Sequence, residues 1–201
     1  NFPDVSLIVC HSARMQTYPN GDRVLVETIG QIEDKKAPCG EAIARQVLLG
    51  EALEDGYSSA ATCSQMARLS TYQRVGGFDA YFRRSEDTDF NIALSLQGGC
   101  FIGIRTPLVL QTMTPTIEKS VQEEYKYTKK LFYKYQDFIE LKSNFPFVIK
   151  WIDIKFYFIK KQYFLFAYFL LKLFIAHPIL VLKRLKQALP NIQSNKRVSH
   201  L

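Results

Sequence analysis

The chain changes its physical character sharply near residue 118. Residues 1–118 carry ten Lys/Arg and fourteen Asp/Glu, a net charge of −4, whereas residues 119–201 carry sixteen and five, a net charge of +11. Of the 27 aromatic residues, eighteen lie between residues 125 and 174. A joint change of charge and aromatic content indicates two segments with different surroundings. We therefore expect a domain at 1–118, a basic aromatic helical extension at 119–189, and a polar, disordered tail at 190–201.

The first segment alternates short apolar runs with turns and helical stretches, which is typical of an α/β fold. An apolar run predicts a buried strand at 5–10. A turn at 19–22 leads to a second strand at 23–27, so a hairpin-like pair is expected. The other predicted elements are a helix at 41–49, a strand at 60–68, helical turns at 69–75, a strand at 100–104 and an extended stretch at 108–113.

Residues 76–90, which read GGFDAYFRRSEDTDF, combine glycines, arginines and acids more densely than any other part of this segment. Apolar residues at helical spacing begin at Phe90 and stop at Gly98, which predicts a helix with Ser85 as its N-cap and three acids in its first turn. Acids at this place complement the helix macrodipole by about 0.3–1 kcal/mol each. The acids alone therefore do not indicate a functional site.

The residues around these acids add features that a helix cap does not need. Gly76 and Gly77 permit positive φ and a close approach of the backbone to a ligand. Arg83 and Arg84 place permanent positive charge beside the carboxylates. We interpret the segment as a loop that presents a carboxylate at a helix start, surrounded by hydrogen-bond donors.

The order of these residues, Gly-Gly-Phe-Asp followed by Glu-Asp at the start of a helix, resembles the acceptor-side motif of family-two inverting glycosyltransferases of the GT-A fold. The flanking stretches that fit the same pattern in order are 40–46, 58–68 and 107–114. The resemblance covers roughly residues 1–120. It implies a partial GT-A fold followed by the helical extension.

The resemblance also implies roles for individual residues. Asp87 would be the general base that deprotonates an acceptor hydroxyl as it attacks the anomeric carbon, and Glu86 would orient the acceptor. The residues implied in substrate binding are Gly76, Gly77, Phe78, Asp79, Arg83 and Arg84. Either arginine would contact a diphosphate or an acidic acceptor group, although an ion pair with Glu86 or Asp89 fits the sequence equally well. The implied reaction transfers a sugar from a nucleotide-sugar to a glycan or lipid-linked acceptor.

A GT-A enzyme holds the donor diphosphate through an Asp-x-Asp metal site that follows an apolar strand. Asp87-Thr88-Asp89 matches this pattern, but it begins a predicted helix after two arginines instead of following an apolar strand. Hard cations also need several converging oxygen ligands. We therefore expect no metal site here, and Mg²⁺ or Mn²⁺ bound in the intact enzyme by a donor half that precedes residue 1. The 201-residue chain alone is expected to be inactive. The alternative function is a non-enzymatic membrane-associated or partner-binding module.

The extension is compatible with several structures. A charged helix is predicted at 119–141, and residues 163–182 are long enough to cross a bilayer, although Lys172, His177 and Pro178 interrupt them. The composition favours a helix that lies on an anionic membrane with one apolar side and lysines that reach water. Packing against the preceding domain or in a homodimer is the alternative. The aromatic residues follow helical stripes rather than a strand platform, which disfavours nucleic acid as a partner.

The cysteines and the chain start bear on location. Cys10, Cys39, Cys63 and Cys100 show no CxxC spacing, so we expect reduced thiols. No signal peptide is visible. These features and the resemblance predict a bacterial cytoplasmic enzyme at the inner face of the cell membrane, acting in cell-envelope polysaccharide synthesis.

His11 is interpreted as a packing or loop residue.

Overall fold

The computed structural model is a mixed α/β structure that describes residues 7–30, 37–53, 60–113 and 121–187. The predicted tail at 190–201 lies outside the described residues. The chain divides into two compact units: Asn1–Val47 with Glu51–Thr116, and Leu48–Gly50 with Ile117–Leu201.

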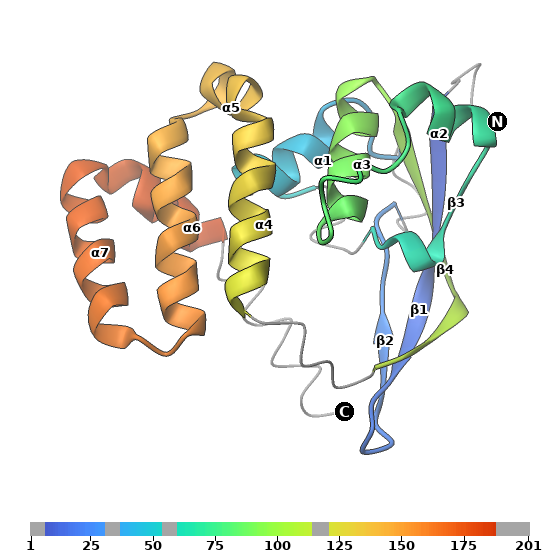
Figure 1. Ribbon diagram of the computed structural model, residues 1–201, viewed down its shortest axis with the longest axis horizontal. Helices are drawn as coiled ribbons and strands as arrows, with labels where there is room; N and C mark the ends of the chain where they lie inside the picture. The colour runs from blue at the N-terminus through green and yellow to red at the C-terminus, as the bar shows by residue number, and fades with distance from the viewer. Residues whose placement is uncertain (1–6, 31–36, 54–59, 114–120, 188–201) are drawn as a thin grey trace. The chain divides into compact units, whose positions relative to one another are not determined.

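A four-stranded mixed sheet is the framework of the first unit (Figure 1). Its strands are β1 (Ile8–Thr17), β2 (Arg23–Val26), β3 (Gln65–Ala67) and β4 (Cys100–Thr112). β1 pairs with all three of the others, antiparallel to β2 and β3 and parallel to β4. Because β4 follows β1 along its whole length, β2 and β3 share the opposite edge of β1, each at a different end.

The predicted hairpin is confirmed, but its first strand is longer than expected. The turn is closed by hydrogen bonds from Tyr18 N to Asp22 O, 2.9 Å, and from Gly21 N to Tyr18 O, 2.9 Å. The strand predicted to end at residue 10 continues to Thr17, while residues 5–6 lie outside the described part. Polar residues after Cys10 hid this continuation, because they break the apolar run although several of them are buried.

Short helices connect and cover the strands. They are α1 (Ala42–Ala44), the π-helix η1 (Arg45–Leu49), the 3-10 helix η2 (Thr62–Ser64), α2 (Leu69–Val75) and α3 (Glu86–Leu96). The helix predicted at 41–49 is confirmed, with its second part π-helical. The strand predicted at 60–68 is mostly wrong, because η2 occupies its centre and only Gln65–Ala67 pairs with β1. The strand predicted at 100–104 and the extended stretch after it form one strand, β4.

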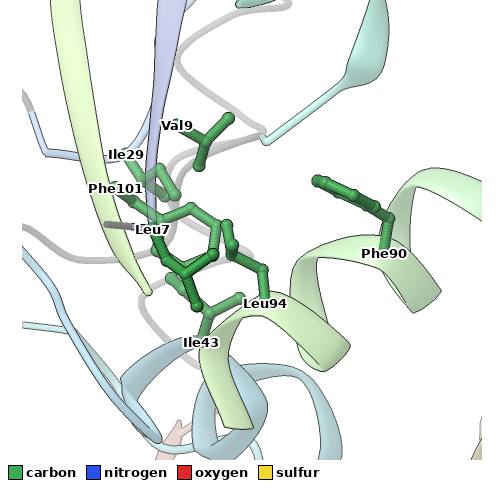
Figure 2. Packing of buried hydrophobic residues seen from close by; sticks show 7 residues of the cluster. All are labelled: Leu7, Val9, Ile29, Ile43, Phe90, Leu94 and Phe101. Carbon is green, nitrogen blue, oxygen red and sulfur yellow. The ribbon is translucent and has the colours of Figure 1, made fainter. Parts of the chain in front are cut away.

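The core of the first unit joins α3 and α1 to the sheet (Figure 2). Its buried members are Leu7, Val9, Ile29, Ile43, Phe90, Leu94 and Phe101. Full burial of such a side chain contributes about 1.5–3 kcal/mol. Phe90 and Leu94 lie on α3 four residues apart, so the same face of this helix meets the strands through both. The core therefore fixes the orientation of α3 relative to the sheet.

The expectation of four reduced cysteines is wrong for two of them. Cys39 and Cys100 form a disulfide, with their Cα atoms 4.1 Å apart in an isolated antiparallel bridge. Beside them, Gly40 N donates to Gly99 O over 3.0 Å. The pairing depends on the chain returning to the start of β4, 61 residues later, so no local spacing indicates it. The free cysteines are Cys10 and Cys63.

The described part of the second unit is helical. Its elements are α4 (Val121–Lys134), α5 (Gln136–Lys142), α6 (Phe145–Ile159), α7 (Tyr163–Ala176) and a further helical stretch at 178–187. The helix predicted at 119–141 is divided, because the backbone of Tyr135 (φ −107°, ψ 26°) leaves the helical conformation. Residues 119–120 lie outside the described part. Asn144 begins α6 as an N-cap, since its side chain accepts a hydrogen bond from Phe147 N, 2.8 Å.

α7 is apolar over most of its surface. Only Leu173 of this helix is buried, while Phe164 and Ile175 are 84% and 74% exposed. The continuous helix considered at 163–182 is wrong, because α7 ends at Ala176 and His177 separates it from the next helical stretch. In the parts of the chain that are described, no helix has the length and apolar character needed to span a membrane.

Candidate functional site

The glycine pair ends α2 and turns the chain toward α3. Gly76 (φ 99°) and Gly77 (φ 71°) both adopt left-handed φ, and both backbone N–H groups donate to Tyr72 O, over 3.1 and 2.8 Å. A Cβ at either glycine would meet no atom within 4 Å. Glycine is therefore needed here for its backbone conformation rather than for lack of space.

Phe78 attaches this loop to α3. Its ring centroid lies 5.8 Å from that of Tyr72 and 5.1 Å from that of Phe90, and the latter two rings are 5.0 Å apart. Burial raises the pKa of the Tyr72 phenol. Phe78 itself is 42% exposed, so one part of its ring packs on the core and the other part faces solvent. Such a surface is suited to an apolar contact with the face of a sugar ring.

Asp79 folds the loop locally. Its Oδ1 accepts a hydrogen bond from Tyr81 N, 2.9 Å, and its carbonyl accepts one from Phe82 N, 3.0 Å. Phe82 is buried, which holds the chain close to the unit before it reaches the arginines. The carboxylate of Asp79 therefore shapes the loop as an Asx turn.

α3 begins at Glu86 as predicted, but the capping role predicted for Ser85 is wrong. Ser85 lies in the left-handed region (φ 64°, ψ 18°), and its side chain makes no capping hydrogen bond. An N-cap side chain reaches the helix when its backbone is extended, which this conformation prevents. Its carbonyl still accepts from Asp89 N, 2.8 Å. Residues other than glycine with such φ cost about 1–3 kcal/mol and cluster at functional sites.

The three acids of the first turn have different environments. Glu86 is exposed, Asp87 is half-buried, and Asp89 is only 3% exposed. Asp87 Oδ1 accepts hydrogen bonds from the backbone N and Oγ1 of Thr88, over 2.7 and 3.2 Å. Its Oδ2 makes no hydrogen bond to any residue in the described ranges. Glu86 and Asp87 are thus accessible to a ligand, whereas Asp89 belongs to the interior.

Two buried polar residues on α3, neither of them predicted from the sequence, hold the side of the helix on which Asp87 lies. Asn91 donates to Ala60 O over 2.8 Å and accepts from Gln65 Nε2 over 3.3 Å. Ser95 Oγ donates to the carbonyl of Gly40 and accepts from the backbone N of Ala44. The available signal was two polar residues four positions apart within the apolar stretch 90–96 of this helix.

Asp87, Asn91 and Ser95 follow one another at intervals of four residues, so they lie on the same side of α3. The two anchored members connect α3 to the loops before η2 and α1. The accessible carboxylate of Asp87 therefore lies on a side of α3 that hydrogen bonds of Asn91 and Ser95 hold in place. This arrangement is able to keep a base at a constant position.

The two arginines of this loop differ in exposure. Arg83 is exposed and forms no ion pair within the described residues. The ion pair with Glu86 or Asp89 that the sequence allowed is therefore not formed by Arg83. Arg84 is half-buried. No group of three or more His, Cys, Asp or Glu side chains that could hold a metal ion occurs in the described ranges.

No protein-family model, curated protein or solved structure matches the chain. Any conclusion about function therefore depends on the residues and their geometry.

Proposed function

We propose that the first unit is the acceptor-binding part of an inverting glycosyltransferase with a GT-A type fold. The observation that supports this best is the contrast between two acids in one helical turn. Asp87 is half-buried at the start of α3, the helix on which the loop residue Phe78 packs through Phe90, whereas Asp89 is buried. The order of the motif and the exposed part of the Phe78 ring support the same function.

In this proposal Asp87 Oδ2 accepts the proton of an acceptor hydroxyl. The hydroxyl oxygen forms a bond to the anomeric carbon of the donor sugar as the bond from that carbon to the phosphate oxygen breaks. The nucleoside diphosphate leaves from the opposite face with the bonding electrons, which inverts the configuration. Glu86 orients the acceptor by hydrogen bonding. Proton transfer to a positioned base contributes typically about 10²–10⁴-fold to the rate.

The acceptor in this proposal is a glycan or a lipid-linked glycan, and Arg83 is available for an acidic group or a diphosphate. Donor binding is assigned to another part of the intact enzyme, as the resemblance implies, together with Mg²⁺ or Mn²⁺. The described residues do not fit a metal site, so no step above depends on one.

Paired substitutions in the intact enzyme test this proposal. Asp87→Asn keeps the size of the side chain and removes its basicity, so kcat should fall about 10²-fold or more with little change in the KM for the donor. Asp89→Asn should instead lower stability by about 1–3 kcal/mol, because the residue is buried. Release of nucleoside diphosphate from a panel of nucleotide-sugars measures turnover. An active Asp87→Asn variant beside a folded but inactive Asp89→Asn variant would show that the base is misassigned.

A second candidate function, which needs no catalysis, is association with an anionic membrane surface. It is favoured by the exposed apolar residues of α7 together with the basic residues of the second unit. The apolar residues surround α7 instead of forming one face, so the expected one-sided amphipathic helix is not what supports it. Co-sedimentation with anionic but not neutral vesicles is the expected result. Equal or absent binding to the two kinds of vesicle would contradict this function, and sedimentation velocity then tests a homodimer.

A further inference from the structure

A pocket of about 340 Å³ lies between α6 and α7. These helices are joined by the short turn at 160–162 and lie side by side (Figure 1). Each helix contributes four residues at the same spacing, i, i+3, i+4 and i+7, starting at Lys150 in α6 and at Phe169 in α7. One complete face of each helix therefore lines the pocket. Its volume lies in the range of about 300–1,000 Å³ that is usual for sites of small ligands.

The inner part of the pocket is apolar. Ile154 and Leu173 are buried beneath it. The rings of Tyr157 and Phe169 stack across it with their centroids 5.2 Å apart and their planes at 6°. A pair of stacked rings is a flat and rigid wall, which suits a hydrocarbon segment.

The charged groups of the pocket are unbalanced. Asp153 is already neutralised, because its Oδ1 lies 3.1 Å from Lys129 Nζ and accepts a hydrogen bond from Tyr125 OH, 2.7 Å. Burial lowers the pKa of Lys129, but its hydrogen bonds to Asp153 and Tyr125 outweigh this effect, so the pKa lies above its ordinary value. Lys129 is therefore charged at neutral pH.

The two lysines that line the pocket have no such partner. Among the residues that the structure describes, neither Lys150 nor Lys172 forms an ion pair, and the ammonium of Lys172 lies 6.0 Å from the Tyr168 ring centroid. The pocket thus joins an apolar wall to two uncompensated positive charges. Lysine ammonium groups are frequent ligands of phosphate oxygens.

We propose that this pocket binds the phosphate head of an anionic phospholipid, with Lys150 and Lys172 on the phosphate and the start of an acyl chain against Tyr157 and Phe169. The pocket is too small for a whole phospholipid, so the remaining chain stays in the bilayer. The proposal specifies which lipid the membrane association proposed above would select. It rests on that proposed function, because the membrane is the source of the lipid. It is independent of the glycosyltransferase proposal.

The alternatives use only half of the pocket. Inorganic phosphate would satisfy the lysines and leave the apolar wall in water. A zwitterionic lipid would cover the wall but would bring its own positive charge toward two ammonium groups. An anionic phospholipid complements both parts.

The test uses the full chain and dihexanoyl phosphatidylglycerol below its micelle concentration, with binding measured by titration calorimetry. Lys150→Gln/Lys172→Gln should weaken binding about tenfold or more, since it removes two charge-assisted contacts. Lys183→Gln/Lys186→Gln is the matched control, because it removes the same charge from exposed positions outside the pocket and should change the affinity less than threefold. Ala176→Phe, which narrows the pocket and keeps both lysines, should weaken binding as well.

Other ligands separate this proposal from the membrane function. Dihexanoyl phosphatidylcholine and inorganic phosphate should each bind at least tenfold more weakly than the phosphatidylglycerol. Equal affinity for the two lipids would overturn the proposal that the pocket binds an anionic phospholipid. Equal effects of the two double variants on the affinity for phosphatidylglycerol would overturn it as well. If phosphatidylglycerol vesicles still bind the Lys150→Gln/Lys172→Gln variant as well as the wild type, the membrane function stands and the pocket proposal fails. If the soluble lipid binds in the pocket but vesicles do not bind, the membrane function fails and a bilayer is not the source of the ligand.

Discussion

His11 makes the stability of the first unit depend on pH. It lies in β1 with none of its surface exposed, and its ring stacks on Phe101 with the centroids 6.2 Å apart. Neither ring nitrogen forms a hydrogen bond in the described structure. Burial, and then the charge of Arg14, lower the pKa of His11 from 6.5 to about 4. The folded protein therefore holds this imidazole in its neutral form.

The sign of the effect follows from the lowered pKa. Below pH 6.5 the unfolded chain binds a proton at His11 that the folded chain does not bind, so stability falls as the pH decreases toward 4. The difference between the two pKa values corresponds to about 3 kcal/mol in the acid limit and to about 2 kcal/mol at pH 5. Above pH 7 the contribution of His11 to the free energy of unfolding no longer changes with pH.

The substitution His11→Leu removes the titrating group. Between pH 7 and pH 5 the wild type should lose about 2 kcal/mol more than this variant. Any packing cost of leucine cancels, because each protein is compared with itself at two pH values. Urea unfolding followed by hydrogen exchange in β1 and β4 measures the effect, since the single tryptophan, Trp151, lies in the other unit. His177→Leu is the control, because residue 177 lies in the second unit and its substitution should leave the pH dependence measured in β1 and β4 unchanged.

Equal losses of stability in the wild type and in His11→Leu would refute this reasoning. Such a result would mean that His11 is protonated, or paired with an acceptor, in the folded state. If the variant loses more stability than the wild type between pH 7 and pH 5, the charged form of His11, and not the neutral form, is the one favoured by the folded state.

Other substitutions test separate features of the fold. Gly30→Ala should cost about 2 kcal/mol or more, because φ is +74° and the new Cβ would lie 2.7 Å from a backbone oxygen of β4; Gly76→Ala, with open space, should cost about 1 kcal/mol. Both costs are measured from urea midpoints. Asn144→Ala should lower the stability of the second unit by about 1 kcal/mol, measured by tryptophan fluorescence. Reduction of the Cys39–Cys100 disulfide should cost about 2–4 kcal/mol, measured by thermal unfolding with and without reductant.

Elements with contiguous signals were predictable from the sequence. The Gly21 turn between two apolar runs predicts the hairpin, and the apolar spacing after Asp89 predicts α3. Features that depend on distant segments were not. After Cys10, β1 contains the buried polar residues His11, Ser12 and Arg14, and β4 pairs with all three from far along the chain. The sequence contains no local trace of that pairing.

The candidate site shows the same division. Positive φ at Gly76 and Gly77 follows from residue type, and the separation of Asp87 from Asp89 follows from helical geometry. The capping role of Ser85 was wrong, because the loop before α3 imposes a backbone conformation that residue type does not predict. The anchoring by Asn91 was missed, because its partners lie near residues 60–65. The catalytic role of Asp87 stays a prediction.

The central place of β1 determines the order in which the sheet can assemble during synthesis. The hairpin with β2 is local and can close once residue 26 has left the ribosome. The parallel partner is the last strand of the unit, with Ile8 opposite Cys100 and Thr17 opposite Thr112. One edge of β1 therefore stays unpaired until residue 112 has emerged. Throughout that interval a nascent chain on a neighbouring ribosome can pair with this edge, so the topology of the sheet exposes the protein to aggregation during its synthesis.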